Sequence, residues 1–338
     1  KMLRKRINNF ILVILSVFIT FLILEFFIRI ILKDGPRTEL NFDLKNQPIS
    51  FIEDQILGWK PKPGIYTFKP WSKNGKKTIL TNLKDGSRLS GYSTKDEKIL
   101  FIGGSLTQGW AVDDNEVFSS LLQKKIQNYN IKNYGVGGYG GVQSYLKLKS
   151  IFEKQNNIKL TIYGFIPHHE VRNIASGSWM YLLNKGSRGT EGKVTLPYAS
   201  IKDGKLIIHE PKQYFKLPLG DKSALIAKIE KRFLKINSFK RSLGETKISK
   251  EIILSMKNIS HQNKSKFMVL FLNKLSSEKL EEYMNFFKKN SIEYINCYFP
   301  EGKDYRVEGE GHPNEIGHRF VSKCIYDELN LKNITLVK

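Results

Sequence analysis

The sequence predicts an α/β protein: a three-layer α/β/α flavodoxin-like domain with a parallel sheet of about five strands. Apolar runs of strand length alternate with helix-period stretches from Lys98 onward, which is the pattern of a parallel sheet covered on both faces. Residue types that carry chemistry recur where these runs end, and such sheets bind ligands at the carboxyl ends of their strands. An N-terminal transmembrane helix and an inserted cap complete the expected architecture.

The N-terminus predicts a membrane anchor. A basic head, residues 1–9, precedes an apolar run over residues 10–32. At about 1.5 Å per residue, such a run crosses a hydrocarbon core of about 30 Å. Glu25 and Arg29 are four residues apart and are expected to pair on one helix face. No small-x-small cleavage site follows, so we expect a retained single-pass anchor, with the main domain periplasmic or extracellular.

Residues 33–97 are expected to form a linker and a small β extension, with short strands near 65–69 and 77–82. Residues 98–338 form the α/β domain. Its expected strands are Ile99–Ile102, Ile131–Tyr134, Leu160–Ile166, Phe267–Leu272 and Ile292–Tyr298. Its expected helices are Val117–Ile126, Val142–Phe152, Ser223–Ile236, Lys250–Ile259 and Ser277–Phe287, with a last helix after His312.

One long insertion, residues 170–222, interrupts this alternation. It contains a predicted hairpin, Val194–Ser200 and Lys205–His209, around Asp203-Gly204. Because an insertion of this length beside a strand end is usually functional, we interpret it as a substrate-shaping cap. Trp179 and Tyr181 within it suit either sugar stacking or core packing.

Charge and cysteine content bound the function classes. The formal net charge of +23 favours anionic partners such as phospholipid headgroups or acidic glycans. The lysines are dispersed and no nucleic-acid-binding motif is present, so nucleic acid is not expected as a partner. The two cysteines, Cys297 and Cys324, form no CxxC pair; a single bridge and two buried thiols both remain open. No metal or other cofactor is expected.

The first chemical motif is Phe101-Ile102-Gly103-Gly104-Ser105-Leu106-Thr107-Gln108-Gly109, between a buried strand and a helix. A serine there exposes its hydroxyl at the sheet edge, and the helix N-terminus offers N–H groups to a developing oxyanion. The second motif, Asn133 to Gly140, contains GxGxxG at Gly135, Gly137 and Gly140. A dinucleotide site lacks its acidic partner at the next strand end, so a tight loop facing the pocket of Ser105 is the alternative.

Two further motifs follow later strands. Gly164 to Glu170 contains His168-His169, and Glu308 to His318 contains Glu310-Gly311-His312. A carboxylate beside a histidine on a loop can supply a base and the group that orients it. Asp304 and Glu308 are alternative partners of His312. A metal site of His168, His169 and Glu170 with His312 or His318 is disfavoured, because neighbouring side chains on an extended segment point apart.

These motifs, in this order, resemble those of the SGNH, or GDSL-like, hydrolase family over about Lys98 to Leu329. Gly103-Gly104-Ser105 resembles the Gly-Asp-Ser block, with Gly104 in place of Asp. Glu310-Gly311-His312-Pro313-Asn314 resembles the Asp-Gly-His-x-Asn variant of membrane-anchored members. The third block departs most, since His168-His169 stand where the family has Asn-Asp.

The resemblance implies acyl transfer, with Ser105 as nucleophile, His312 as base and Glu310 as the orienting acid. The oxyanion would be held by the N–H groups of Ser105 and Gly138, together with His168. It implies an esterase that removes, or transfers, acetyl groups on a cell-envelope glycan. A lipid esterase and a non-catalytic module that binds a glycan or partner are the alternatives.

Overall fold

The computed structural model describes residues 2–37, 47–73, 75–183, 190–213 and 215–332. Parts of the predicted head, linker, insertion and C-terminus lie outside the described residues. The chain divides into two compact units, which we describe separately. The main unit comprises residues 42–176, 187–213 and 240–338, and the helical unit comprises residues 1–41, 177–186 and 214–239.

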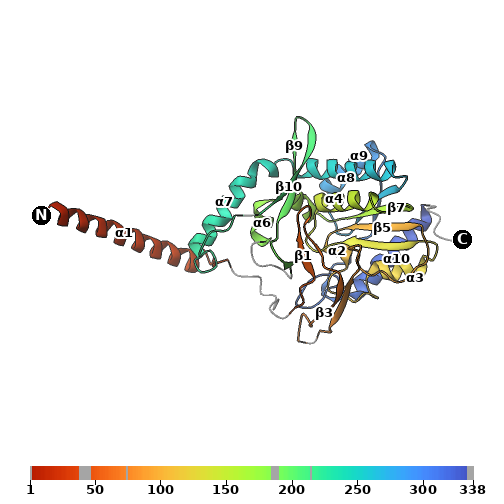
Figure 1. Ribbon diagram of the computed structural model, residues 1–338, viewed down its shortest axis with the longest axis horizontal. Helices are drawn as coiled ribbons and strands as arrows, with labels where there is room; N and C mark the ends of the chain where they lie inside the picture. The colour runs from red at the N-terminus through yellow and green to blue at the C-terminus, as the bar shows by residue number, and fades with distance from the viewer. Residues whose placement is uncertain (1, 38–46, 74, 184–189, 214, 333–338) are drawn as a thin grey trace. The chain divides into compact units, whose positions relative to one another are not determined.

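A parallel sheet of five strands forms the centre of the main unit (Figure 1). The strands are β5 (Lys98–Gly103), β6 (Asn130–Gly135), β7 (Ile158–Phe165), β11 (Lys266–Phe271) and β12 (Glu293–Asn296). Their spatial order is β12-β11-β7-β5-β6, and each neighbouring pair is parallel. The order along the sheet is that of flavodoxin-like folds, with its switch point between β5 and β7. The predicted fold class is confirmed.

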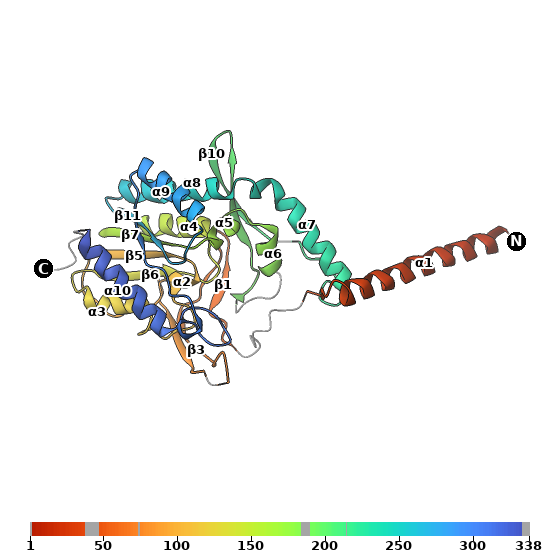
Figure 2. The same cartoon turned by 180° about the vertical axis from the view of Figure 1, so that it is seen from behind.

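Helices cover both faces of this sheet (Figures 1 and 2). On one face lie α3 (Phe118–Lys125) and α10 (Glu315–Leu331), and on the other lie α4 (Gly141–Phe152), α8 (Glu245–Gln262) and α9 (Ser277–Lys289). Successive strand residues alternate between the faces. Phe101 therefore packs in the cluster with α3 and α10, whereas Leu100 and Ile102 pack in the cluster with α4, α8 and α9.

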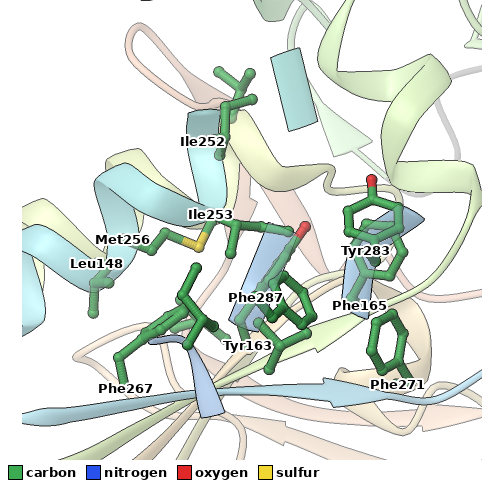
Figure 3. Close-up of a cluster of buried hydrophobic side chains, with 14 of the residues drawn as sticks. Leu148, Tyr163, Phe165, Ile252, Ile253, Met256, Phe267, Phe271, Tyr283 and Phe287 are labelled. Carbon is green, nitrogen blue, oxygen red and sulfur yellow. The ribbon is translucent and has the colours of Figure 1, made fainter. Parts of the chain in front are cut away.

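The second cluster is rich in aromatic rings (Figure 3). Side chains of β7 and β11 meet helices α8 and α9, and both strands are buried beyond their exposed lysines, Lys159 and Lys266. The residues that make this contact include Phe165, Phe271, Ile252, Met256, Tyr283 and Phe287. All of them are fully buried.

Four short strands in the described residues precede the central sheet along the chain. β1 (Phe51–Asp54) and β2 (Gly58–Pro61) pair antiparallel, as do β3 (Gly64–Phe68) and β4 (Thr78–Asn82). β8 (Thr190–Glu191), from the insertion, pairs in parallel with β1. We call residues 51–97 the β extension.

The insertion contains the hairpin expected from its sequence. β9 (Leu196–Lys202) and β10 (Lys205–Lys212) pair antiparallel. Asp203 and Gly204 both have positive φ, 51° and 75°, as a tight two-residue hairpin turn requires. Ala199 of β9 is buried in the same cluster as Ile248 and Ile252 of α8, so the hairpin packs on that helix layer. A substrate-shaping role for the insertion stays a prediction.

The helical unit contains α1 (Met2–Ile30), α6 (Gly177–Leu183) and most of α7 (Ala224–Ser242). Helix α1 is long and apolar enough to span a membrane or to serve as a signal anchor. Glu25 accepts a hydrogen bond from Arg29 at 2.6 Å, which confirms the predicted pair. The Glu25 carboxylate also accepts the Ser223 hydroxyl and the backbone N–H groups of Ala224 and Leu225. The last turns of α1 therefore hold the first turn of α7.

Candidate active site

Ser105, His312 and Glu310 form a continuous hydrogen-bonded chain. The Nε2 atom of His312 lies 2.8 Å from the Oγ atom of Ser105, although 207 positions separate them. The Nδ1 atom of His312 lies 2.7 and 2.9 Å from the two carboxylate oxygens of Glu310. Glu310 also accepts the backbone N–H of His312 at 2.8 Å. This geometry lets the imidazole take a proton from the hydroxyl while the carboxylate fixes its tautomer.

Among the described residues, the His312 imidazole is hydrogen-bonded to neither of the alternative carboxylates, Glu308 and Asp304. Glu308 accepts a hydrogen bond from the Ser72 hydroxyl at 3.0 Å. The backbone carbonyl of Asp304 accepts the side-chain amide of Asn314 at 2.8 Å. The side chain of Glu310 is only 4% exposed, so its contact with His312 is shielded from water. Glu310 is the carboxylate that this loop brings to the imidazole.

Ser105 is placed by a tight turn between β5 and α2 (Ser105–Gln108). We call this turn, residues 103–105, the nucleophile turn, after the role that the sequence predicts for Ser105. Gly103 has a φ of 154°, and a Cβ there would lie 2.2 Å from the Oγ1 of Thr107. Gly135, at the end of β6, is equally constrained, since its Cβ would lie 2.3 Å from the backbone N of Gln108. The first glycine of the GxGxxG pattern is therefore required by the close approach of β6 to α2.

Arg88 of the β extension holds the segment that follows Ser105. Its buried guanidinium donates to the carbonyls of Gln108, Gly109 and Val112. It also lies 3.1 Å from a carboxylate oxygen of Asp114. Burial lowers the pKa of Arg88, and the Asp114 charge acts in the opposite direction. No local pattern around Arg88 indicates this role, because the contacts join Arg88 to a different motif.

Trp59 of β2 contacts the loop of residues 135–140, which we call the glycine loop. Its indole Nε1 donates to the carbonyl of Gly137 at 3.0 Å. In a trans peptide the C=O and N–H point in opposite directions, so the N–H of Gly138 points away from the indole. Gly138 has a φ of 82°, and the N–H of Val136 donates to the carbonyl of Gly103 at 3.1 Å. The glycine loop and the nucleophile turn are therefore joined directly.

His169, rather than His168, lies against the nucleophile turn. His168 is exposed in the first turn of α5 (His168–Asn173), whereas His169 is fully buried. A Cβ on Gly104 would lie 2.9 Å from the Nε2 of His169 and 3.1 Å from the carbonyl oxygen of Tyr139. Gly104 stands where the resembled pattern has Asp, and a larger side chain would collide with His169.

His169 is neutral and lies beside the Tyr163 hydroxyl. The hydroxyl oxygen lies 2.7 Å from the Nδ1 of His169. Burial raises the pKa of the Tyr163 hydroxyl and lowers the pKa of His169 well below its ordinary value, so both groups are uncharged. In the tautomer in which the hydroxyl donates its hydrogen bond to Nδ1, the imidazole carries its proton on Nε2, the atom next to Gly104.

A disulfide closes the segment that carries Glu310 and His312. Cys297 and Cys324 are bonded, with their Cα atoms 5.7 Å apart, and so join the residue after β12 to helix α10. This decides between the bridge and the two thiols that the sequence left open. Glu310 and His312 lie on the chain between the two half-cystines.

Other predicted site residues are placed elsewhere. Glu170 is buried and accepts hydrogen bonds from Tyr283, at 2.8 Å, and from Lys279, so it ties α5 to α9. Within the described ranges, no three His, Cys, Asp or Glu side chains gather as a metal site. Trp179 is 5% exposed, which favours core packing over sugar stacking.

Comparisons with known proteins find similarity in solved structures. No family model matches the chain, and no curated protein matches it in sequence. The psychrotrophic esterase EstA from Pseudoalteromonas sp. has a TM-score of 0.42 and 12% identity, over 70% of this chain and 100% of that one. An acetyl xylan esterase from the rumen bacterium Butyrivibrio proteoclasticus has a TM-score of 0.41 and 12% identity, over 78% of this chain and 68% of that one.

A member of the lipolytic G-D-S-L family from Veillonella parvula has a TM-score of 0.39 and 11% identity, over 69% of this chain and 98% of that one. At such values these similarities carry no argument about chemistry. The assignment of a reaction rests on the contacts of Ser105 in this chain.

Proposed function

We propose that the protein is a serine esterase of the SGNH type that acts through an acyl-enzyme. The observation that carries the proposal is the continuous hydrogen-bonded chain from Ser105 through His312 to Glu310. An alcohol is a weak nucleophile unless a base removes its proton. The 2.8 Å contact between Ser105 and His312 supplies that base.

The first half-reaction forms an ester on Ser105. Its Oγ attacks the carbonyl carbon of the substrate as His312 Nε2 takes the hydroxyl proton. The oxyanion is held by the N–H groups of Ser105 and Gly138, with His168 or His169 as the third group. When the intermediate collapses, the C–O bond to the leaving alcohol breaks and His312 returns the proton to that alcohol.

The second half-reaction regenerates the serine. His312 takes a proton from water as the water oxygen attacks the carbonyl carbon of the acyl-serine. When this intermediate collapses, the bond between that carbon and Ser105 Oγ breaks, His312 returns the proton to Oγ, and the carboxylic acid leaves. If a sugar hydroxyl takes the place of water, the same steps transfer the acyl group.

We propose that the protein acts at the membrane surface, on the side that faces an oxidising compartment. Helix α1 would hold the domain at the membrane. The Cys297–Cys324 disulfide favours a periplasmic or extracellular location, because such bonds persist in oxidising compartments. We therefore propose acetylated cell-envelope glycan as the substrate. A lipid ester is the alternative substrate. The length of the acyl chain that the enzyme prefers distinguishes the two.

Rates on nitrophenyl esters of the full-length chain in detergent test both points. Ser105→Ala should lower kcat by about 10⁴-fold or more, and Glu310→Gln by about 10³–10⁴-fold. Glu308→Gln is the matched control, since this carboxylate of the same loop binds Ser72 rather than His312. A kcat of Ser105→Ala equal to that of the wild type would contradict the proposal. A preference for acetyl over long-chain esters supports the glycan substrate, and the reverse supports the lipid.

A further inference from the structure

Helix α7 carries large apolar side chains on the face opposite its buried side. Ala227 and Leu234 are buried on the inner side. Ile229, Phe233 and Ile236 follow one another at helical spacing on the outer side, and they are 51%, 45% and 60% exposed. The Phe233 ring lies 4.9 Å from that of Phe215, which is 45% exposed. We call Phe215, Ile229, Phe233 and Ile236 the outer patch.

Cations border the outer patch. Lys231, Arg232 and Lys235 are exposed on the same helix. The only acidic residue of α7, Glu230, is buried, and it binds Arg37 and the backbone N–H of Leu217. The exposed surface of the helix is therefore apolar and positive, without a compensating carboxylate from α7. This is the composition of helices that lie in the interface of anionic membranes.

The start of α7 is fixed to the end of the apolar helix. Glu25 of α1 accepts hydrogen bonds from Ala224 and Leu225 at 2.9 Å each, and Arg29 donates to the carbonyl of Lys222 at 2.8 Å. From this junction α7 leaves in a different direction from α1 (Figures 1 and 2). If α1 crosses a bilayer, the first turn of α7 lies where the membrane-spanning part ends.

We propose that α7 lies in the headgroup layer of an anionic phospholipid bilayer, with the outer patch among the acyl chains and Lys231, Arg232 and Lys235 at the phosphates. The inference rests on the proposed membrane anchoring by α1 and is independent of the ester chemistry. A soluble polyanion would satisfy the cations but would leave the outer patch in water, whereas a bilayer satisfies both.

Site-specific fluorescence on the full-length chain in vesicles tests the proposal. Both native cysteines are in the disulfide, so Ile236→Cys provides a free thiol for an environment-sensitive dye. Tyr92→Cys, at a position 86% exposed in the main unit, is the water-exposed control. Ser16→Cys, in the middle of α1, reports on the anchor itself. The vesicles contain phosphatidylglycerol with phosphatidylcholine, or phosphatidylcholine alone, and carry spin-labelled lipid as quencher, with the label at a shallow position for residues 236 and 92 and at a deep position for residue 16.

On anionic vesicles the dye at residue 236 should shift to the blue and be quenched by the lipid, while the dye at residue 92 is quenched by aqueous iodide. Equal iodide quenching at both positions would overturn the proposal. A blue shift without lipid quenching would also overturn it, since a protein partner would then cover the outer patch. Lipid quenching at residue 16 without quenching at residue 236 separates failure of this inference from failure of the anchor.

Charge reversal tests the lipid preference. The triple variant Lys231→Glu, Arg232→Glu and Lys235→Glu should lower lipid quenching at residue 236 on anionic vesicles to the level seen on phosphatidylcholine, because each cation near an anionic surface contributes to binding. Its rate on a soluble acetyl ester should match the wild type, which separates this result from loss of the active site. Unchanged quenching in the triple variant would contradict the role of these cations.

Discussion

Gly104 and His169 explain each other at the level of single residues. The nucleophile turn has no side chain at residue 104 because His169 Nε2 and the Tyr139 carbonyl occupy the space where a Cβ would be. The two departures from the resembled family pattern are therefore in contact. Both departures are visible in the sequence, but their contact is not. The sequence does not distinguish the adjacent His168 and His169, and only the helical turn of α5 shows which of them is buried.

A double-mutant cycle tests this contact. Gly104→Ala alone should destabilise the protein, because the methyl group meets His169. In a His169→Ala background the same change should cost less, with a coupling of about 1 kcal/mol or more. Denaturant unfolding of the four proteins measures it. Additive effects would show that the Gly104 and His169 positions do not interact, and His168→Ala is the control that should not couple.

Trp59 gives a second prediction at this scale. Trp59→Phe keeps an aromatic ring but loses the hydrogen bond to the Gly137 carbonyl, so the peptide that carries the Gly138 N–H, a proposed oxyanion donor, is no longer held in place. Since loss of a whole oxyanion donor costs about 10²–10³-fold, we expect kcat to fall by about 10-fold, with little change in KM. A change in KM alone, measured by steady-state kinetics, would assign Trp59 to binding instead.

At the level of elements, α10 follows the loop that holds Glu310 and His312, and it carries the buried His318. Burial lowers the pKa of His318 from 6.5 to about 3. Because the unfolded chain takes up this proton first on acidification, the free energy of unfolding should fall as pH drops below 6.5, by up to about 1.4 kcal/mol per pH unit from this group. His318→Gln should flatten the dependence between pH 6.5 and 5. An unchanged slope would contradict the assignment; exposed His261→Gln is the control.

The disulfide is a second constraint on the same element. It joins α10 to the chain after β12 across 27 positions. Replacing both cysteines with alanine should lower the free energy of unfolding by about 3–4 kcal/mol, as expected for a loop of this length. Denaturant melts of the wild type and the double variant measure the loss. A difference below about 1 kcal/mol would indicate that the loop is already ordered in the reduced chain.

At the level of the whole molecule, the sheet could be predicted because its central strands, β5, β7 and β11, are mostly apolar and are buried on both faces. The pairing of Glu310 with His312 could also be proposed, since two positions separate them. The contributions of Trp59 and Arg88 could not, because both come from the β extension and act on motifs that local patterns cannot connect to it. The extension is part of the framework of the site.

The proposed reaction requires that His312 activates Ser105 as a nucleophile. Peptide mass spectrometry of the full-length chain, after treatment with a fluorophosphonate that reacts with activated serines, tests this requirement. We predict a single adduct on Ser105 in the wild type and its loss in His312→Ala with the fold intact. An unmodified Ser105 in folded wild-type protein, or equal modification in His312→Ala, would contradict the account.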